Sequence, residues 1–177
     1  MRTLVVNLFA GPGGGKTTCA WDIASKLKQR GIEAEYVSEY AKELVWDGKT
    51  EMLDGSLENQ KKLYEEQNRR VQRLLGKVDV VVTDSPAILS AIYAKETDEE
   101  FIKQMLSDFN NQKNFNLFIN RGKTFQQQGR IHTLEESKKI DKEIKKFLVD
   151  NNIYFGNYYH KTLNVVVDNI ILNLGGK

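Results

Sequence analysis

A glycine-rich segment near the start of the chain combines residue types that bind phosphate groups. It reads Ala10-Gly11-Pro12-Gly13-Gly14-Gly15-Lys16-Thr17-Thr18, between an apolar run at 4–9 and an amphipathic stretch that ends at Gly31. This context predicts a strand, a loop and then a helix, which is the setting that a phosphate-binding loop requires. Glycines let backbone N–H groups turn inward toward an anion, and the N-terminus of the helix adds the positive end of its dipole.

The spacing agrees with the pattern G-x-x-x-x-G-K-[ST] except at the first position, where Ala10 stands. The departure is mild, because a methyl group there removes no phosphate ligand. We expect Lys16 to reach the outer phosphates of ATP and the Thr17 hydroxyl to coordinate Mg²⁺. The expected ATP-binding residues are Gly11, Gly13, Gly14, Gly15, Lys16, Thr17 and Thr18.

Asp84 ends a short apolar run, Val80-Val81-Val82-Thr83, which is typical of a buried parallel strand. A carboxylate at such a strand tip can hold a metal ion beside the phosphates, so Asp84 is a second expected Mg²⁺ ligand and a candidate catalytic residue. The alternative is a helix cap for Ser85-Pro86-Ala87. Ser85 stands where motor ATPases often have a Glu that orients the attacking water, which argues against a hydrolysing machine.

Glu39 follows a second predicted strand and would lie beside the mouth of the glycine-rich loop. There it could accept the proton of an acceptor hydroxyl, which is the role of the base in a kinase. The alternative is a solvated helix face that Glu39 shares with Lys42 and Glu43. Tyr40 and Trp46 could stack on a planar base, although core packing is the commoner fate of such rings.

A polar segment at 121–132 follows another predicted strand and contains Arg121 and Arg130. In small phosphotransferases a closing lid at this place brings arginines to the transferring phosphoryl group and excludes water. We therefore expect a lid-like loop at about 121–133 in which both arginines act in catalysis. The alternative is a surface loop with solvated arginines.

Strands and helices alternate along the chain. Apolar patterns predict strands at 3–9, 33–37, 78–83, 115–120 and 153–158. Helices are expected between the strands and at the C-terminal end. The expected helix caps are Ser56, Thr97 with Glu100, and Thr133 with Glu136. The segment 47–55 is expected to be a mobile loop. The prediction is an α/β fold: a P-loop NTPase-type three-layer sandwich with a mostly parallel five-stranded sheet and helices on both faces. The length of 177 residues suits one domain over 1–177.

Charge is unevenly distributed although the formal net charge is only +2. Residues 1–100 carry 14 Lys and Arg against 17 Asp and Glu, or −3, and residues 101–177 carry 12 against 7, or +5. A modestly basic half suits a phosphate-bearing substrate but is not the dense cluster of a sequence-reading DNA binder. Cys19 is the only cysteine, which excludes an internal disulfide and favours a reducing compartment, and we expect no membrane association.

These motifs together resemble those of small phage-type P-loop kinases. That group is related to the nicotinamide riboside kinase domain of bacterial NAD-salvage proteins and to phage 5-hydroxymethyluracil-DNA kinases. The resemblance covers about residues 3–160 in the same order and rests on 10–18, Ser38-Glu39-Tyr40-Ala41, Thr83-Asp84-Ser85-Pro86 and the segment 120–136. The triplet Gly13-Gly14-Gly15 departs from the family, which more usually has Ser or Lys within the loop.

The resemblance implies a cytoplasmic kinase (in the host cytoplasm if a phage encodes it) with MgATP as donor and a hydroxyl on a nucleoside-like acceptor. It implies that Lys16 and Thr17 are phosphate and metal ligands, Asp84 the strand-tip carboxylate and Arg130 a lid arginine, with Glu39 on the acceptor side. The expected acceptor is 5-hydroxymethyluracil in phage DNA, and a free nucleoside or nucleotide, such as nicotinamide riboside, is the alternative. A rival class is an ATP-gated interaction protein with slow hydrolysis. The oligomeric state stays open.

Overall fold

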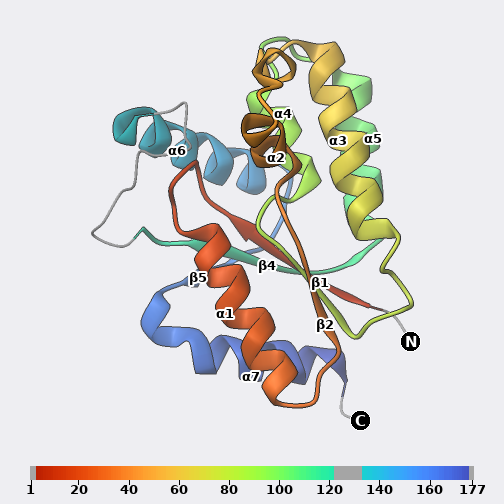
Figure 1. Cartoon of the computed structure of the whole chain (residues 1–177), viewed down its shortest axis with the longest axis vertical. Helices are drawn as coiled ribbons and strands as arrows, with labels where there is room; N and C mark the ends of the chain where they lie inside the picture. Colours follow the sequence, from red (N-terminus) through yellow and green to blue (C-terminus); the bar gives the residue numbers. More distant parts are fainter. Residues whose placement is uncertain (1–2, 122–132, 176–177) are drawn as a thin grey trace.

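The computed structural model describes residues 3–121 and 133–175 (Figure 1). The strands are β1 (Leu4–Phe9), β2 (Ala34–Val37), β3 (Val80–Thr83), β4 (Lys113–Ile119) and β5 (Gly156–Tyr158). The α-helices are α1 (Lys16–Gln29), α2 (Tyr40–Trp46), α3 (Leu57–Gln72), α4 (Ser90–Tyr93), α5 (Glu99–Asn110), α6 (Leu134–Asp150) and α7 (Leu163–Leu174). Short 3₁₀ turns are η1 (Thr50–Leu53), η2 (Ala87–Leu89) and η3 (His160–Thr162).

The five strands form one sheet in the order β2-β3-β1-β4-β5, and each of its four pairings is parallel. All five strands therefore end at the same edge of the sheet. The residues that follow β1, β2, β3 and β4 meet at this edge, which is where open parallel sheets bind ligands. The topology thus brings together the segments that the sequence singles out after each of these strands.

Helices cover both faces of the sheet (Figure 1). One face packs against α1 and α7 through a core that includes Leu8, Ile23 and Val167. The other face packs against α5 and α6 through Phe118, Phe109 and Ile144, and against α3 through a smaller cluster. The predicted three-layer α/β sandwich is confirmed, and its sheet is parallel throughout the described pairings.

Two of the three predicted helix caps are confirmed. The Ser56 hydroxyl accepts a hydrogen bond from the Asn59 N–H, and Thr133 and Glu136 form the predicted capping box of α6. The third prediction, that Thr97 caps α5, is wrong. The adjacent Asp98 begins α5 instead, because its carboxylate accepts the Phe101 N–H at 3.0 Å and its charge suits the positive end of the helix dipole.

Two other expectations need correction. The segment 47–55, expected as a loop, contains η1, and the last strand is three residues long rather than six, because it pairs only with the end of β4. In the described ranges, no helix is both long and apolar enough to cross a bilayer.

Candidate functional site

The glycine-rich loop closes tightly over the end of β1. Gly15 has φ 91°, in the left-handed region that favours glycine, and its carbonyl accepts the N–H of Cys19 as α1 begins. A Cβ on Gly14 would lie 2.5 Å from the Cβ of Ala10, so only glycine fits there. Residues 16–18 form the first turn of α1, where backbone N–H groups have no acceptor within the helix, and they line a cavity. This is the arrangement that binds a phosphate.

Lys16 lies inside this loop and is only 9% exposed. Its ammonium donates hydrogen bonds to the carbonyls of Ala10 at 2.8 Å and Gly11 at 3.3 Å. Burial lowers the pKa of Lys16 below its ordinary value, while the nearby carboxylates of Glu39 and Asp84 act in the opposite direction. A phosphate group could replace the two carbonyls as the partner of the ammonium.

Asp84 joins β3 to the loop through Thr17. The carboxylate is 1% exposed, and its Oδ2 accepts the Thr17 hydroxyl at 2.6 Å and the Tyr36 hydroxyl at 2.8 Å. Burial and the charge of Asp84 raise the pKa of Tyr36, so this phenol stays a donor. The structure therefore places Asp84 against the loop rather than as a cap of the following turn.

The second carboxylate oxygen of Asp84, Oδ1, is buried and has no hydrogen-bond partner among the described residues. A buried unpaired carboxylate oxygen is costly unless something else binds it. Magnesium prefers oxygen ligands and is commonly held by one or two carboxylates together with substrate phosphates. Asp84 and the Thr17 hydroxyl thus fit a Mg²⁺ ion.

Glu39 lies at the junction of β2 and α2 and lines the same cavity. The junction is fixed by the buried side chain of Gln67 on α3, which accepts the Tyr40 N–H at 2.9 Å and donates to the Ser38 carbonyl at 3.1 Å. Arg70 adds two hydrogen bonds of 2.7 Å to Glu43. Glu39 is therefore brought near Lys16, whereas Glu43 is committed to the scaffold of α2.

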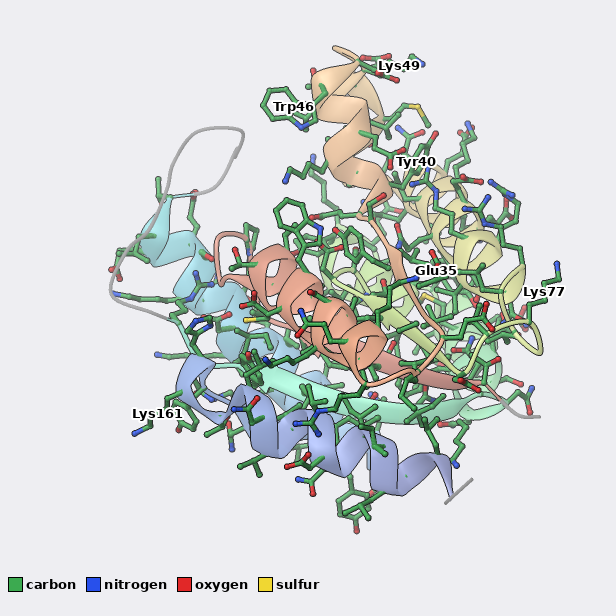
Figure 2. The ribbon with its side chains drawn as sticks, turned by 60° about the horizontal axis from the view of Figure 1, so that its bottom comes forward. Glu35, Tyr40, Trp46, Lys49, Lys77 and Lys161 are labelled. Carbon is green, nitrogen blue, oxygen red and sulfur yellow. The ribbon has the colours of Figure 1, made fainter. Side chains whose placement is uncertain are left out.

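The loop, α2, α3 and the turn after β3 enclose a cavity of about 500 Å³, which is within the range of small-ligand sites. Tyr40 and Trp46 lie at opposite ends of α2, and Trp46 projects from it on the side away from α3 (Figure 2). Trp46 lines the cavity and is 72% exposed, so it belongs to the rim and not to the core.

Arg121 lies at the end of β4 and braces the loop from outside. Its guanidinium donates to the Pro12 carbonyl at 3.0 Å and forms an ion pair with Asp141 of α6. The Asp141 carboxylate also accepts the Gly11 N–H at 2.6 Å, and the Ser137 hydroxyl donates to Pro12. We call Arg121, Ser137 and Asp141 the loop brace.

The brace explains the glycine at 11, because a Cβ there would lie 2.5 Å from the Ser137 carbonyl. Within the described chain, the contacts of Arg121 are those of a support for the loop. Arg130 and nearly all of the expected lid lie outside the described residues. Cys19 is in the core, and burial raises the pKa of its thiol to about 11, which fits a packing role.

Sequence reasoning missed Tyr36 and Asp141. Tyr36 stands in β2, where an aromatic residue is ordinary, and no spacing links it to Asp84. Asp141 lies in a charged run of α6 that is typical of a solvated helix face. Only the packing of α6 beside the loop shows its role.

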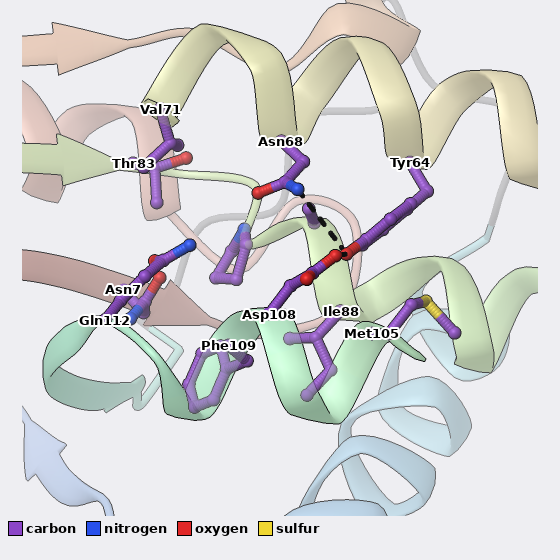
Figure 3. Close-up of a pocket in the computed structure, with 12 residues that line it drawn as sticks. Asn7, Tyr64, Asn68, Val71, Thr83, Ile88, Met105, Asp108, Phe109 and Gln112 are labelled. Atoms are coloured by element: carbon purple, nitrogen blue, oxygen red, sulfur yellow. Dashed lines mark hydrogen bonds between the residues drawn. The ribbon is translucent and has the colours of Figure 1, made fainter. Parts of the chain in front are cut away.

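A second cavity lies between α3 and α5 (Figure 3). Its volume of about 20 Å³ admits one water molecule. Tyr64 donates a hydrogen bond to Asp108 at its wall, and Asn68 donates to Tyr64. Of the two cavities, the larger one can take a nucleotide.

Several solved structures share this fold. NadR in complex with NR superposes with a TM-score of 0.73 at 18% identity, and the match covers 99% of this chain and 52% of that one. Chaetomium thermophilum Kti12 in complex with ADP-AlF3 superposes with a TM-score of 0.59 at 13% identity, and the match covers 97% of this chain and 100% of that one. Mycobacterium tuberculosis APS kinase CysC in complex with AMPPNP and APS superposes with a TM-score of 0.52 at 14% identity, and the match covers 98% of this chain and 97% of that one.

These identities establish the fold alone, and the chain spans about half the length of the NadR chain. A search of curated proteins found no match. A comparison with protein families matches one described as "AAA domain" over residues 5–159, which includes the loop, Glu39, Asp84 and the brace. On that match, and with a phosphate-binding loop on a parallel sheet, the chain belongs to the AAA domain family.

Proposed function

We propose that the protein is an ATP-dependent kinase that transfers the γ-phosphoryl group of MgATP to a hydroxyl of a nucleoside-like acceptor. The observation that carries this proposal is the contact between Thr17 and Asp84, with Lys16 and the loop N–H groups around the same cavity. Phosphate, metal and acceptor functions thus converge on one edge of the sheet. Among the solved structures of this fold are NadR in complex with NR and an APS kinase with a nucleotide analogue.

The triphosphate lies against the loop, where the N–H groups of residues 16–18 and the Lys16 ammonium bind its oxygens. The Thr17 hydroxyl and the Asp84 carboxylate would hold Mg²⁺. When bound, the ion offsets charge on the phosphate oxygens. Tyr36 and the loop brace orient these groups from outside, so the site needs little rearrangement as charge develops.

We assign the base to Glu39 rather than Asp84. Asp84 is engaged by two hydroxyl donors at one oxygen and is the natural metal ligand through the other. Glu39 lines the cavity from the side of α2, where the acceptor would enter. It takes the proton of the attacking hydroxyl while the γ-phosphoryl group passes to that oxygen and ADP leaves.

Two acceptors fit this chemistry. The resemblance of the sequence motifs implies 5-hydroxymethyluracil in DNA, and the +5 charge of residues 101–177 is compatible with a polyanion. A free nucleoside such as nicotinamide riboside is the alternative, which the small-molecule size of the cavity favours. Strong salt dependence of activity would indicate DNA.

The test is transfer of label from γ-labelled ATP to nicotinamide riboside, to ordinary deoxynucleosides and to oligonucleotides that contain 5-hydroxymethyluracil. Phosphate release without acceptor measures hydrolysis. Label should appear on one class of acceptor and should depend on it. Release of phosphate at the same rate with and without every acceptor would instead support an ATP-gated interaction protein.

Three variants sharpen the test. Lys16→Ala should abolish transfer with an unchanged circular dichroism spectrum, whereas the exposed Lys77→Ala should transfer normally. Glu39→Gln should lower kcat by about 10²–10⁴-fold with ATP affinity retained. Asp84→Asn should instead weaken Mg²⁺-dependent ATP binding. If Lys16→Ala retains activity, or if Glu39→Gln is as active as the wild type, the assigned roles are wrong.

A further inference from the structure

Two buried glutamines of α3 face the large cavity, and they differ in one respect. Gln67 is 5% exposed, and its amide oxygen and nitrogen are each hydrogen-bonded to the backbone, of Tyr40 and Ser38 respectively. Gln60 is 4% exposed and lines the cavity, yet its side chain makes no hydrogen bond with any described residue. The Gln60 amide is not among the fully buried polar groups that lack a partner, so its polar atoms are open to the cavity, where a ligand could bond them.

The cavity that Gln60 lines has walls that suit a planar ring. Leu53, Leu63 and Leu89 give the cavity apolar walls, and Trp46 supplies an aromatic rim. Ser90, 8% exposed, lines the same cavity, and its hydroxyl makes no hydrogen bond with a described residue. This combination of apolar walls and a few unpaired polar groups is typical of a specific small-molecule site.

An amide side chain offers a donor and an acceptor side by side in one plane. It pairs with a planar group that has an N–H beside an acceptor atom, and in the acceptors proposed above this is an N–H beside a C=O. Such an edge occurs in the imide of a uracil-type ring and in a ring carboxamide. Neither edge carries a net charge, which matches the neutral Gln60 and Ser90.

We propose that Gln60 is a specificity-determining residue that reads the amide-type edge of the acceptor's ring by a paired hydrogen bond. This inference rests on the proposed function, because it takes the cavity beyond the loop to be the acceptor site. It narrows the acceptor class to rings that present an N–H next to an acceptor atom, which in the acceptors proposed above is a C=O.

The test measures binding calorimetrically with AMPPNP present, so that it needs no turnover. The probes are 5-hydroxymethyl-2′-deoxyuridine, an oligonucleotide with the same base, and nicotinamide riboside. Whichever probe binds the wild type, Gln60→Leu should lower the affinity for it by about 30-fold, which is the effect of losing two hydrogen bonds. Gln72→Leu, an exposed glutamine of the same helix, is the matched control and should bind normally.

A second arm uses the wild type and does not depend on how the variant folds. Methylation of the ring N3 of 5-hydroxymethyl-2′-deoxyuridine, or of the amide nitrogen of nicotinamide riboside, removes the donor of that edge. Each methylation should lower the affinity of the wild type for the probe by about tenfold or more. The same methylation should not lower the affinity of Gln60→Leu any further. Equal affinity for parent and methylated probes in the wild type, or no probe bound at all, would overturn the inference.

The arms also separate this inference from the proposed function. If a probe binds with the expected dependence on Gln60 but no label is transferred from ATP, the kinase assignment fails and the reading role of Gln60 stands. If label is transferred but Gln60→Leu keeps the wild-type affinity and preference, the kinase assignment stands and the role of Gln60 is refuted.

Discussion

The loop brace gives a prediction that separates a supporting role of Arg121 from a catalytic one. The perturbation is Arg121→Gln, which removes the charge and most of the hydrogen bonds to Pro12, Ser137 and Asp141. The two partners of the ion pair are 15% and 16% exposed, so the pair is close to buried. Loss of one partner leaves the Asp141 carboxylate with the Gly11 N–H alone among its described donors.

Breaking a buried ion pair costs about 3–5 kcal/mol, and the partial exposure puts this pair at the lower end, about 3 kcal/mol. For a chain of this size, about 1 kcal/mol shifts Tm by roughly 2–4 °C, so we expect a fall in Tm of about 6–12 °C. The KM for ATP should rise because the loop is less firmly held, while kcat changes little.

The assay is thermal and urea denaturation of Arg121→Gln, Asp141→Asn and the double variant, followed by kinetics. The two single losses should not add, since both variants break the same pair; a coupling of about 2–3 kcal/mol is expected. Arg73→Gln, at an exposed arginine after α3, should change stability by less than about 0.5 kcal/mol. A thousandfold fall in kcat with unchanged stability would refute the brace and support the catalytic role predicted from the sequence.

Three other predictions concern the loop and the proposed metal site. Gly14→Ala should destabilise the protein by about 1–3 kcal/mol and abolish ATP binding, because its Cβ would lie 2.5 Å from the Cβ of Ala10. The control Gly156→Ala should be tolerated, because the atom nearest to its Cβ would be 3.6 Å away. Equal ATP affinities of the two variants would contradict this prediction. Tyr36→Phe removes a hydrogen-bond donor to Asp84, so it should weaken ATP binding about tenfold when Mg²⁺ is present and leave it unchanged in EDTA. Calorimetry measures both affinities. An equal loss of affinity in the two conditions would argue against a metal-orienting role of Tyr36. Because burial lowers the pKa of Lys16 and only the ammonium binds phosphate, ATP affinity should fall as pH rises, with a midpoint below 10.5. Lys16→Arg should remove this dependence, and an unchanged pH profile in that variant would exclude Lys16 as its source.

The sequence predicts the parts of the molecule that local rules decide. The glycine pattern, the strand before it and the capping box at Thr133 each depend on residues a few positions apart. Parallel strands that end at one edge then place the loop, Glu39 and Asp84 together, so most of the candidate site follows from topology.

The missed features depend on contacts between distant segments. Asp141 meets the Gly11 N–H across 130 positions, and Tyr36 meets Asp84 across 48. Nothing in the local spacing of either residue marks it as special. Gln60 is likewise one of several polar residues in a polar helix, and only its burial at the cavity wall distinguishes it.

The positions of the two tryptophans give the molecule a pair of built-in optical reporters. Trp46 stands at the cavity rim, and Trp21 packs edge-on against Tyr36, whose hydroxyl is bonded to Asp84. Under the proposed function, one indole therefore borders the acceptor side and the other is linked through Tyr36 to the metal side. In single-tryptophan forms, the emission of each would follow occupancy of its own half of the site, so the order in which the two halves fill could be read in real time without a label.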